Sequence, residues 1–269
     1  MKNGIYEISN DEYHSSLGIS RSGLTKIIDA PIYYKSAYID KKGSIQTNAM
    51  IIGNALHTKV LEPELFDSQY YCLSKIDRRT TDGKAEYAKA LAMSNGKTLL
   101  KSEDMDLIEI LSHSIKKNPD AVGLMDNTLH EKSLYWTDDE TGILCKARPD
   151  FMFLSERISY VGDIKTTKNA SPFNFQKDMF NYGYHIQAAM IAEGLKQIKG
   201  IIVEDFYYVV VEKAEPYVTA IYKINSEALE HGHKKFREGL TLLKKCQETN
   251  EWPSYPIQDL GLPSYAYYN

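Results

Sequence analysis

Apolar residues recur at helical spacing through most of the first 118 residues. The spacing predicts helices over residues 22–29, 49–61, 84–94 and 102–117. Ser20 is placed to cap the first of these helices, and Pro63 follows the second, where a proline ends a helix. We therefore expect a mostly helical N-terminal part, residues 1–118.

The pattern changes after Asn118-Pro119, where residues 129–137 alternate with period two. A turn at 138–142, a second strand at 143–154 and a third, apolar strand at 158–166 follow, which predicts a meander of three strands. A helix over 172–197, strands at 204–212 and 217–224, and a closing helix over 226–250 follow. This order predicts an α/β (α+β) fold with a mixed central sheet flanked by helices. Since no linker interrupts the chain, we expect one domain over 1–269, with an αβ core at 119–250 and a C-terminal tail at 251–269.

Composition narrows the class of protein. Hydrophobic residues make up 43% of the 269 residues, which suffices for a sizeable core. The longest apolar runs, such as 207–211, are too short to cross a bilayer, and residues 1–20 are too polar for a secretory signal. Cys72, Cys145 and Cys246 form no C-x-x-C pair. These features predict a cytoplasmic protein with no membrane partner.

The formal net charge of -4 hides an uneven distribution. Residues 75–101 hold seven Lys and Arg against three acids, whereas residues 102–140 hold ten acids against three lysines. A negative total therefore does not exclude local contacts with a polyanion such as nucleic acid.

The most informative chemistry lies at Asp150 and, thirteen residues later, at Asp163-Ile164-Lys165. On a strand, Asp163 and Lys165 leave the same face about 7 Å apart. Two carboxylates and the Ile164 carbonyl are oxygen ligands of the kind that Mg²⁺ prefers. An ordinary salt bridge on a solvated strand is the alternative reading of the same residues.

Motifs along nearly the whole chain resemble those of the PD-(D/E)xK nuclease superfamily. More narrowly, the chain resembles the exonuclease VIII (RecE-type) recombination exonucleases of phages and prophages. The matching residues are Ile8-Ser9-Asn10, Tyr13-His14, Gly53-Asn54-Ala55-Leu56-His57, Leu61-Glu62-Pro63-Glu64, Arg78-Arg79-Thr80, Gly83-Lys84, Tyr135-Trp136, Glu140-Thr141-Gly142-Ile143-Leu144-Cys145, Arg148-Pro149-Asp150, Asp163-Ile164-Lys165-Thr166-Thr167, Tyr182, Tyr184-His185, Gln187 and Glu251-Trp252-Pro253. The resemblance implies a restriction-endonuclease-like core in which Asp150 and Asp163 bind Mg²⁺ and Lys165 supports the attacking water.

Four further residues are candidates for the same site. His57 matches a histidine that related nucleases place beside the metal; a core histidine on an apolar helix face is the alternative. Glu131 shares strand parity with Ser133 and is either a cleft residue or a surface acid. Tyr184 and Gln187 share a helix face. The family uses this segment to line the cleft, whereas a buried pair that pins helix to sheet is the other reading.

The expected DNA contacts are Arg78, Arg79 and Lys84, in a loop suited to phosphate, and Thr166 beside the lysine. A solvated basic loop is the alternative for the first three. The closing helix carries five basic residues that face DNA, a neighbouring subunit or solvent. Ala30 stands where some relatives place a cluster-binding cysteine, so we expect no iron–sulfur cluster.

The resemblance implies a Mg²⁺-dependent exonuclease, with Mn²⁺ able to substitute, that degrades linear double-stranded DNA from an end. A 5′-to-3′ direction would leave 3′ tails for a RecT-like single-strand annealing protein. It further implies a ring-shaped homo-oligomer, a trimer or tetramer, encoded by a phage or prophage in a bacterial host. The alternatives are an endonuclease or a CRISPR-adaptation-type nuclease of the same fold, and a non-catalytic DNA-end-binding protein.

Overall fold

The structure is a computed structural model that describes residues 1–42, 46–76, 79–263 and 266. Its helices are α1 (Asn10–Ser15), α2 (Arg21–Asp29), α3 (Pro31–Tyr34), the π-helical turn η1 (Lys35–Ile39), α4 (Asn48–Leu61), α5 (Pro63–Gln69), α6 (Thr81–Met93), α7 (Ser102–Lys117), α8 (Pro119–Met125), α9 (Pro172–Asn181), α10 (Tyr184–Lys199) and α11 (Ser226–Thr249). Its strands are β1 (Gly4–Tyr6), β2 (Tyr70–Cys72), β3 (Thr98–Leu100), β4 (Leu129–His130), β5 (Ser133–Thr137), β6 (Leu144–Ala147), β7 (Phe151–Leu154), β8 (Ser159–Thr167), β9 (Asp205–Glu212) and β10 (Thr219–Lys223). The mixed α/β class expected from the sequence is confirmed.

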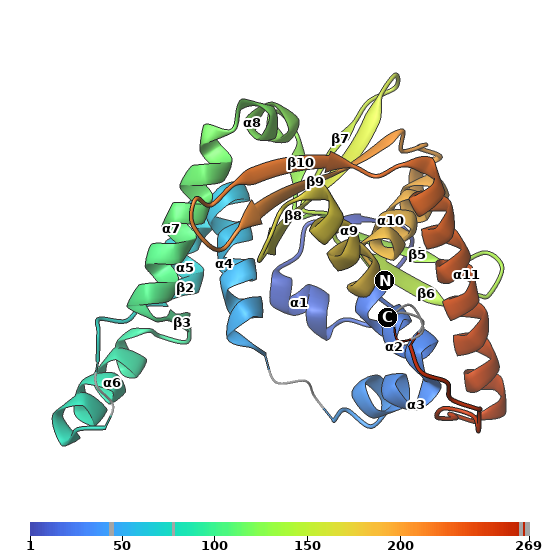
Figure 1. Ribbon diagram of the computed structural model, residues 1–269, viewed down its shortest axis with the longest axis horizontal. Coiled ribbons are helices and arrows are strands. Elements are labelled where there is room, and N and C mark those ends of the chain that lie inside the picture. Colours follow the sequence, from blue (N-terminus) through green and yellow to red (C-terminus); the bar gives the residue numbers. More distant parts are fainter. Residues whose placement is uncertain (43–45, 77–78, 264–265, 267–269) are drawn as a thin grey trace.

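The central element is a five-stranded mixed sheet in the order β10-β9-β8-β7-β4. Strand β8, the longest, pairs antiparallel with β7 and parallel with β9. The parallel pair is connected through α9 and α10, as a crossover requires. Figure 1 shows the strands spanning the molecule, with α4 and α7 on one side and α10 and α11 on the other.

The predicted meander of three strands is wrong. Residues 129–137 and 143–154 each divide into two strands, and the second half of each lies in a different sheet from the first. β5 and β6 form a separate sheet with β1, whereas β4 and β7 belong to the central sheet. The first break occurs at Glu131, whose left-handed φ of 49° ends the pairing. The second occurs at Pro149, which has no N–H for a ladder.

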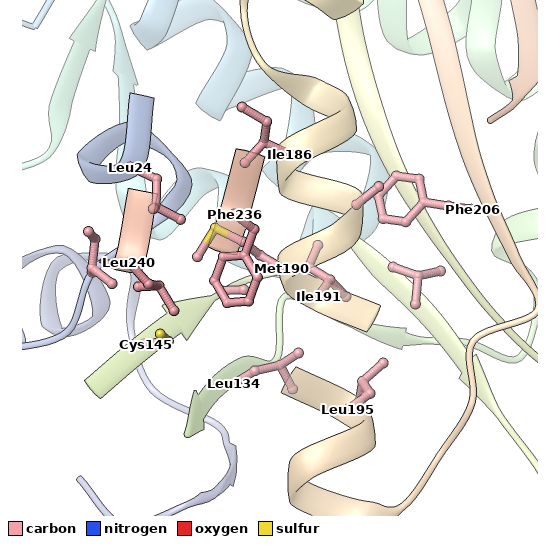
Figure 2. Packing of buried hydrophobic residues seen from close by; sticks show 14 of the residues in the cluster. Leu24, Leu134, Cys145, Ile186, Met190, Ile191, Leu195, Phe206, Phe236 and Leu240 are labelled. Atoms are coloured by element: carbon pink, nitrogen blue, oxygen red, sulfur yellow. The ribbon is translucent and has the colours of Figure 1, made fainter. Parts of the chain in front are cut away.

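Helix α10 fills the space between the central sheet and the small β1-β5-β6 sheet. Figure 2 shows its side chains Ile186, Met190, Ile191 and Leu195 pointing into a cluster of buried residues. Leu134 and Cys145 of the small sheet, Phe206 of the central sheet, Phe236 and Leu240 of α11, and Leu24 of α2 complete the labelled part of this cluster. Eight residues of α10 are buried, which explains why its sequence reads as apolar nearly all round.

A second cluster covers the other face of the central sheet. Ile164, Val209 and Val211 pack there against Leu56 of α4 and Leu111 of α7. Strand alternation sends Ile164 to this side and Asp163 and Lys165 to the α10 side. The two charged residues of β8, Asp163 and Lys165, therefore leave the sheet on the face opposite Ile164.

The single helix predicted over 172–197 is two helices, α9 and α10. Gly183 separates them with a left-handed φ of 66°, which an ordinary side chain adopts only with strain. Three short helices, α1, α5 and α8, lie where no helix was predicted. Among the residues described, no helix is both long enough and apolar enough to span a membrane.

Candidate active site

Asp150 and Asp163 meet because β7 pairs with β8. Phe151 lies opposite Gly162, so Asp150, the residue before β7, reaches the start of Asp163-Ile164-Lys165. The Ile164 N–H donates to Asp150 Oδ2 at 2.5 Å. Asp150 is 5% exposed and Asp163 1% exposed. Burial and the neighbouring Asp163 charge raise the pKa of Asp150 well above its usual value.

Lys165 and Gln187 hold the Asp163 carboxylate from the α10 side. Gln187 Nε2 donates to Asp163 Oδ1 at 2.8 Å, while Lys165 Nζ donates to Gln187 Oε1 at 3.4 Å and forms an ion pair with Asp163 Oδ2. The ammonium lies 4.6 Å from the centre of the Tyr184 ring. Tyr184 and Gln187 thus share the face that their spacing predicted, and that face meets the site.

His57 enters the site from α4 on the opposite side. Its Nε2 lies 2.9 Å from the Ile164 carbonyl oxygen, and its Nδ1 lies 3.5 Å from Asp150 Oδ1 and 4.0 Å from Glu131 Oε1. Burial is the largest influence on the pKa of His57 and lowers it, which favours the neutral imidazole that binds metals. The contacts to three site residues disfavour the reading of His57 as a core histidine.

Glu131 reaches the site from the break between β4 and β5, not from a strand position as its parity suggested. Its backbone N–H donates to the Asp150 carbonyl at 3.0 Å, and its Oε2 accepts from Arg148 Nε at 2.8 Å. Burial, more than the nearby Asp150 charge, raises the pKa of Glu131 to about 7. Glu131 therefore lies in the cavity wall with a side chain that is 15% exposed, while its role in a reaction stays a prediction.

The carboxylates line two connecting cavities. One, of about 290 Å³, contains Asp150, Asp163, Lys165 and Gln187 in its wall. The other, of about 400 Å³, extends from His57 and Glu131 toward α5. Both cavities include Asn10, from α1, and Asn54, from α4. The resemblance included both asparagines without a role; because α1 was not predicted, no pattern indicated that Asn10 would face the cleft.

The donor set fits a hard divalent cation. One ligand atom each from His57, Glu131 and Asp150 lies within 4.8 Å of the others. Asp163 Oδ2 is buried, and its partner in the structure is the Lys165 ammonium. The Ile164 carbonyl oxygen lies 2.9 Å from His57 Nε2, so this backbone oxygen adjoins the same cluster. Asp150, Asp163, His57 and the Ile164 carbonyl are thus placed to hold Mg²⁺ or Mn²⁺, with Glu131 as a further carboxylate beside them.

Two of the predicted DNA contacts, Arg79 and Lys84, lie apart from this cluster. Arg78 falls outside the described residues. Arg79 precedes α6, and Lys84 lies in the first turn of that helix, not in the predicted loop. Figure 1 shows α6 at the end of the molecule opposite α11, away from β8. Thr166 leaves β8 on the face opposite Lys165. Contact of these four residues with DNA stays a prediction.

The raised pKa of Glu131 predicts how the stability of the metal-free protein changes with pH. The folded protein holds a proton on Glu131 between the ordinary pKa of 4.5 and about 7, whereas the unfolded chain releases it. The contribution of Glu131 to the free energy of unfolding is therefore complete below pH 4.5 and is lost as the pH rises through 7. The free energy of unfolding should fall by up to about 3 kcal/mol over this range.

Urea unfolding in a chelating buffer at pH 5 and pH 8 measures this change. Glu131→Gln should reduce the fall in unfolding free energy between the two pH values, while Glu64→Gln, an exposed change on α5, should not. An equal fall in the wild type and Glu131→Gln would contradict the assignment.

Comparisons with known proteins give the family of the chain and a solved structure of similar fold. The family model for a PDDEXK-like domain of unknown function (DUF3799) matches residues 20–258. The chain is similar to the crystal structure of a "Putative exonuclease" from Eubacterium rectale, with 13% identity, a TM-score of 0.61, and coverage of 94% of this chain and 97% of that chain. It is also similar to SSO0001, with 17% identity, a TM-score of 0.33, and coverage of 71% and 86%. No curated protein matches. The match over residues 20–258, most of the chain, identifies the protein as a member of the PDDEXK-like domain family DUF3799.

Proposed function

We propose that this protein is a Mg²⁺-dependent exodeoxyribonuclease that degrades linear double-stranded DNA from an end. The convergence of Asp150, Asp163 and Lys165 in one cavity wall carries the proposal. A binding protein has no need of an ammonium group beside two buried carboxylates. A nuclease needs both, because the carboxylates hold a cation and the ammonium orients or stabilises the attacking water.

Each of these side chains has a defined task in phosphodiester hydrolysis. A bound divalent cation lowers the pKa of water and stabilises charge on the phosphate oxygens. Asp150 and Asp163 would hold that cation, and a neutral His57 imidazole would add a ligand without adding charge. Lys165 stands beside Asp163, where it can orient the attacking water and stabilise developing negative charge. Gln187 bonds both partners and fixes their relative orientation.

The charges along the groove support action at a strand end. On the side of Asp163 and Lys165, the cavity also contains the cation Arg21. The second cavity lies on the far side of His57, and its wall contains Glu7, Glu12 and Glu62. A strand that continued through both cavities would bring its phosphates against these acids. A strand that ends near His57 avoids that repulsion.

Four finer parts of the proposal rest on the resemblance to exonuclease VIII. They are a 5′-to-3′ direction, a ring-shaped homo-oligomer around the DNA, a RecT-like annealing partner for the 3′ tail, and a phage or prophage origin. A ring fits the chemistry, since enclosure keeps a protein with a net charge of -4 on its polyanionic substrate.

Digestion of duplexes labelled separately at the 5′ and 3′ termini tests the activity. In Mg²⁺ we expect loss of the 5′ label as mononucleotides, a retained 3′ label on a single strand, and no release in a chelator. A covalently closed circle should survive while its linearised form is consumed.

The outcomes separate the alternatives. Rapid cutting of the circle would identify an endonuclease. Retention of duplex ends in a gel shift without release of nucleotides at any metal concentration would identify an end-binding protein. Loss of the 3′ label first would reverse the proposed direction.

A further inference from the structure

Two cations near the end of β6 hold helix α1 at both of its ends. Lys146 Nζ donates to the carbonyl oxygens of Tyr13 and Ser16, each at 2.7 Å, near the C-terminus of α1. Arg148 Nη1 donates to the carbonyl oxygens of Ile8, at 3.1 Å, and Ser9, at 3.4 Å, just before the helix. Helix α1 contributes Asn10 to both cavities. Its position over the groove therefore depends on these two side chains.

Arg148 differs from Lys146 because it also contacts the site. Its Nε donates to Glu131 Oε2 at 2.8 Å, and its Nη1 donates to Ser133 Oγ at 3.2 Å. Arg148 and Glu131 lie at the two points where the chain passes between the sheets, and the Glu131 N–H bonds the Asp150 carbonyl there. The Arg148 guanidinium thus connects the two points where the chain changes sheets to the residues just before α1.

We propose that Arg148 is a positioning residue that fixes the direction of the Glu131 carboxylate toward His57 and Asp150 and couples it to helix α1. The proposal rests on the proposed function, since it assigns Glu131 to the cation site. Glu131 has a left-handed backbone, and its side chain is 15% exposed, so solvent contributes little to its orientation. The fork of the guanidinium bonds the carboxylate through Nε while Nη1 holds the main chain, which the single ammonium of a lysine cannot reproduce in the same geometry.

The affinity for Mn²⁺ without DNA, measured by calorimetry, is the primary test. Arg148→Met should weaken Mn²⁺ binding about 10- to 100-fold, as is usual for loss of a residue that orients a metal ligand. Arg148→Lys should recover only part of the loss. Lys146→Met is the matched control, because it removes two bonds to α1 without touching a site carboxylate; its Mn²⁺ affinity should stay within about threefold of the wild type.

A double-mutant cycle separates positioning from a general loss of structure. If Arg148 acts through Glu131, Glu131→Gln with Arg148→Met should bind Mn²⁺ as weakly as Glu131→Gln alone. Near-UV circular dichroism checks that each variant is folded. If Arg148→Met is not folded, Arg148→Lys replaces it in the Mn²⁺ measurement. The proposal would be overturned if the folded Arg148 variant bound Mn²⁺ as tightly as the wild type, or if Lys146→Met lost as much Mn²⁺ affinity as Arg148→Met. It would also be overturned if the two single losses of Mn²⁺ affinity multiplied in the double variant. Tight Mn²⁺ binding by a wild-type protein that releases no nucleotides would instead overturn the proposed function and leave the role of Arg148 open to the same measurement.

Discussion

Changing Asp163 to asparagine is expected to lower the rate of nucleotide release from linear duplex by about a thousandfold or more. The substitution preserves the shape of the side chain and removes one of the two charges that hold the cation. Stabilisation of the transition state by a metal is worth several kcal/mol, and each 1.4 kcal/mol is about tenfold in rate. The rate should be measured at saturating Mg²⁺, so that weaker metal binding alone does not explain the loss.

The same substitution should change the stability of the metal-free protein only modestly, because two effects oppose each other. Asp163 is buried beside Asp150, and its Oδ2 forms an ion pair with Lys165 Nζ. Removal of the charge relieves repulsion between the two carboxylates but leaves the Lys165 ammonium without its partner, while the asparagine oxygen can still accept from Gln187. Thermal unfolding in a chelator checks this. Asp205→Asn, the same change on the neighbouring strand β9, is the matched control for activity. Undiminished release by Asp163→Asn would refute the metal assignment.

Changing Gly162 to alanine is expected to destabilise the fold by about 3 kcal/mol or more. Gly162 lies on β8 directly opposite Phe151, whose ring covers the glycine. A Cβ at this position would lie only 1.9 Å from Phe151 Cζ, and the ring is fully buried, so it has no space to move into. The clash falls between Asp150 and Asp163, and the loss of metal affinity should accompany the loss of stability.

Urea unfolding measures the expected change. Gly123→Ala, on α8, is the matched control, because a Cβ there meets no atom within 4 Å. Alanine is favoured over glycine within a helix, so this control should be stabilised by up to about 1 kcal/mol. If Gly162→Ala unfolds at the wild-type urea concentration, the packing of Phe151 over Gly162 is wrong.

The elements that could be predicted are those with a strong local signal. The helices near 49–61 and 102–117 and the strand at 204–212 lie close to their predicted bounds, because each helix has one continuous apolar face and the strand is a continuous run of apolar residues. The predictions that were wrong concern breaks within a continuous pattern. Residues 143–154 are largely apolar at both ends, yet the chain changes sheets at Pro149 between them. Both halves are mostly buried, so their composition is the same whichever sheet each half joins.

The candidate site also contains residues that a local pattern indicated and residues that no local pattern indicated. The types and spacing of Asp150, Asp163 and Lys165 indicated a cation site, because those side chains come from segments close together in sequence. His57 is held against Ile164 by a contact across 107 residues, and no local pattern reports such a contact.

The sequence by itself determined the periodicity of most elements, the burial of the central strands and the residue types of the site. Only the tertiary structure decided which acids face one cavity, that Glu131 is one of them, and that Arg148 holds it. The physical reason is that side-chain periodicity reports which face of an element is buried, whereas the partner of that face is chosen by packing between distant segments.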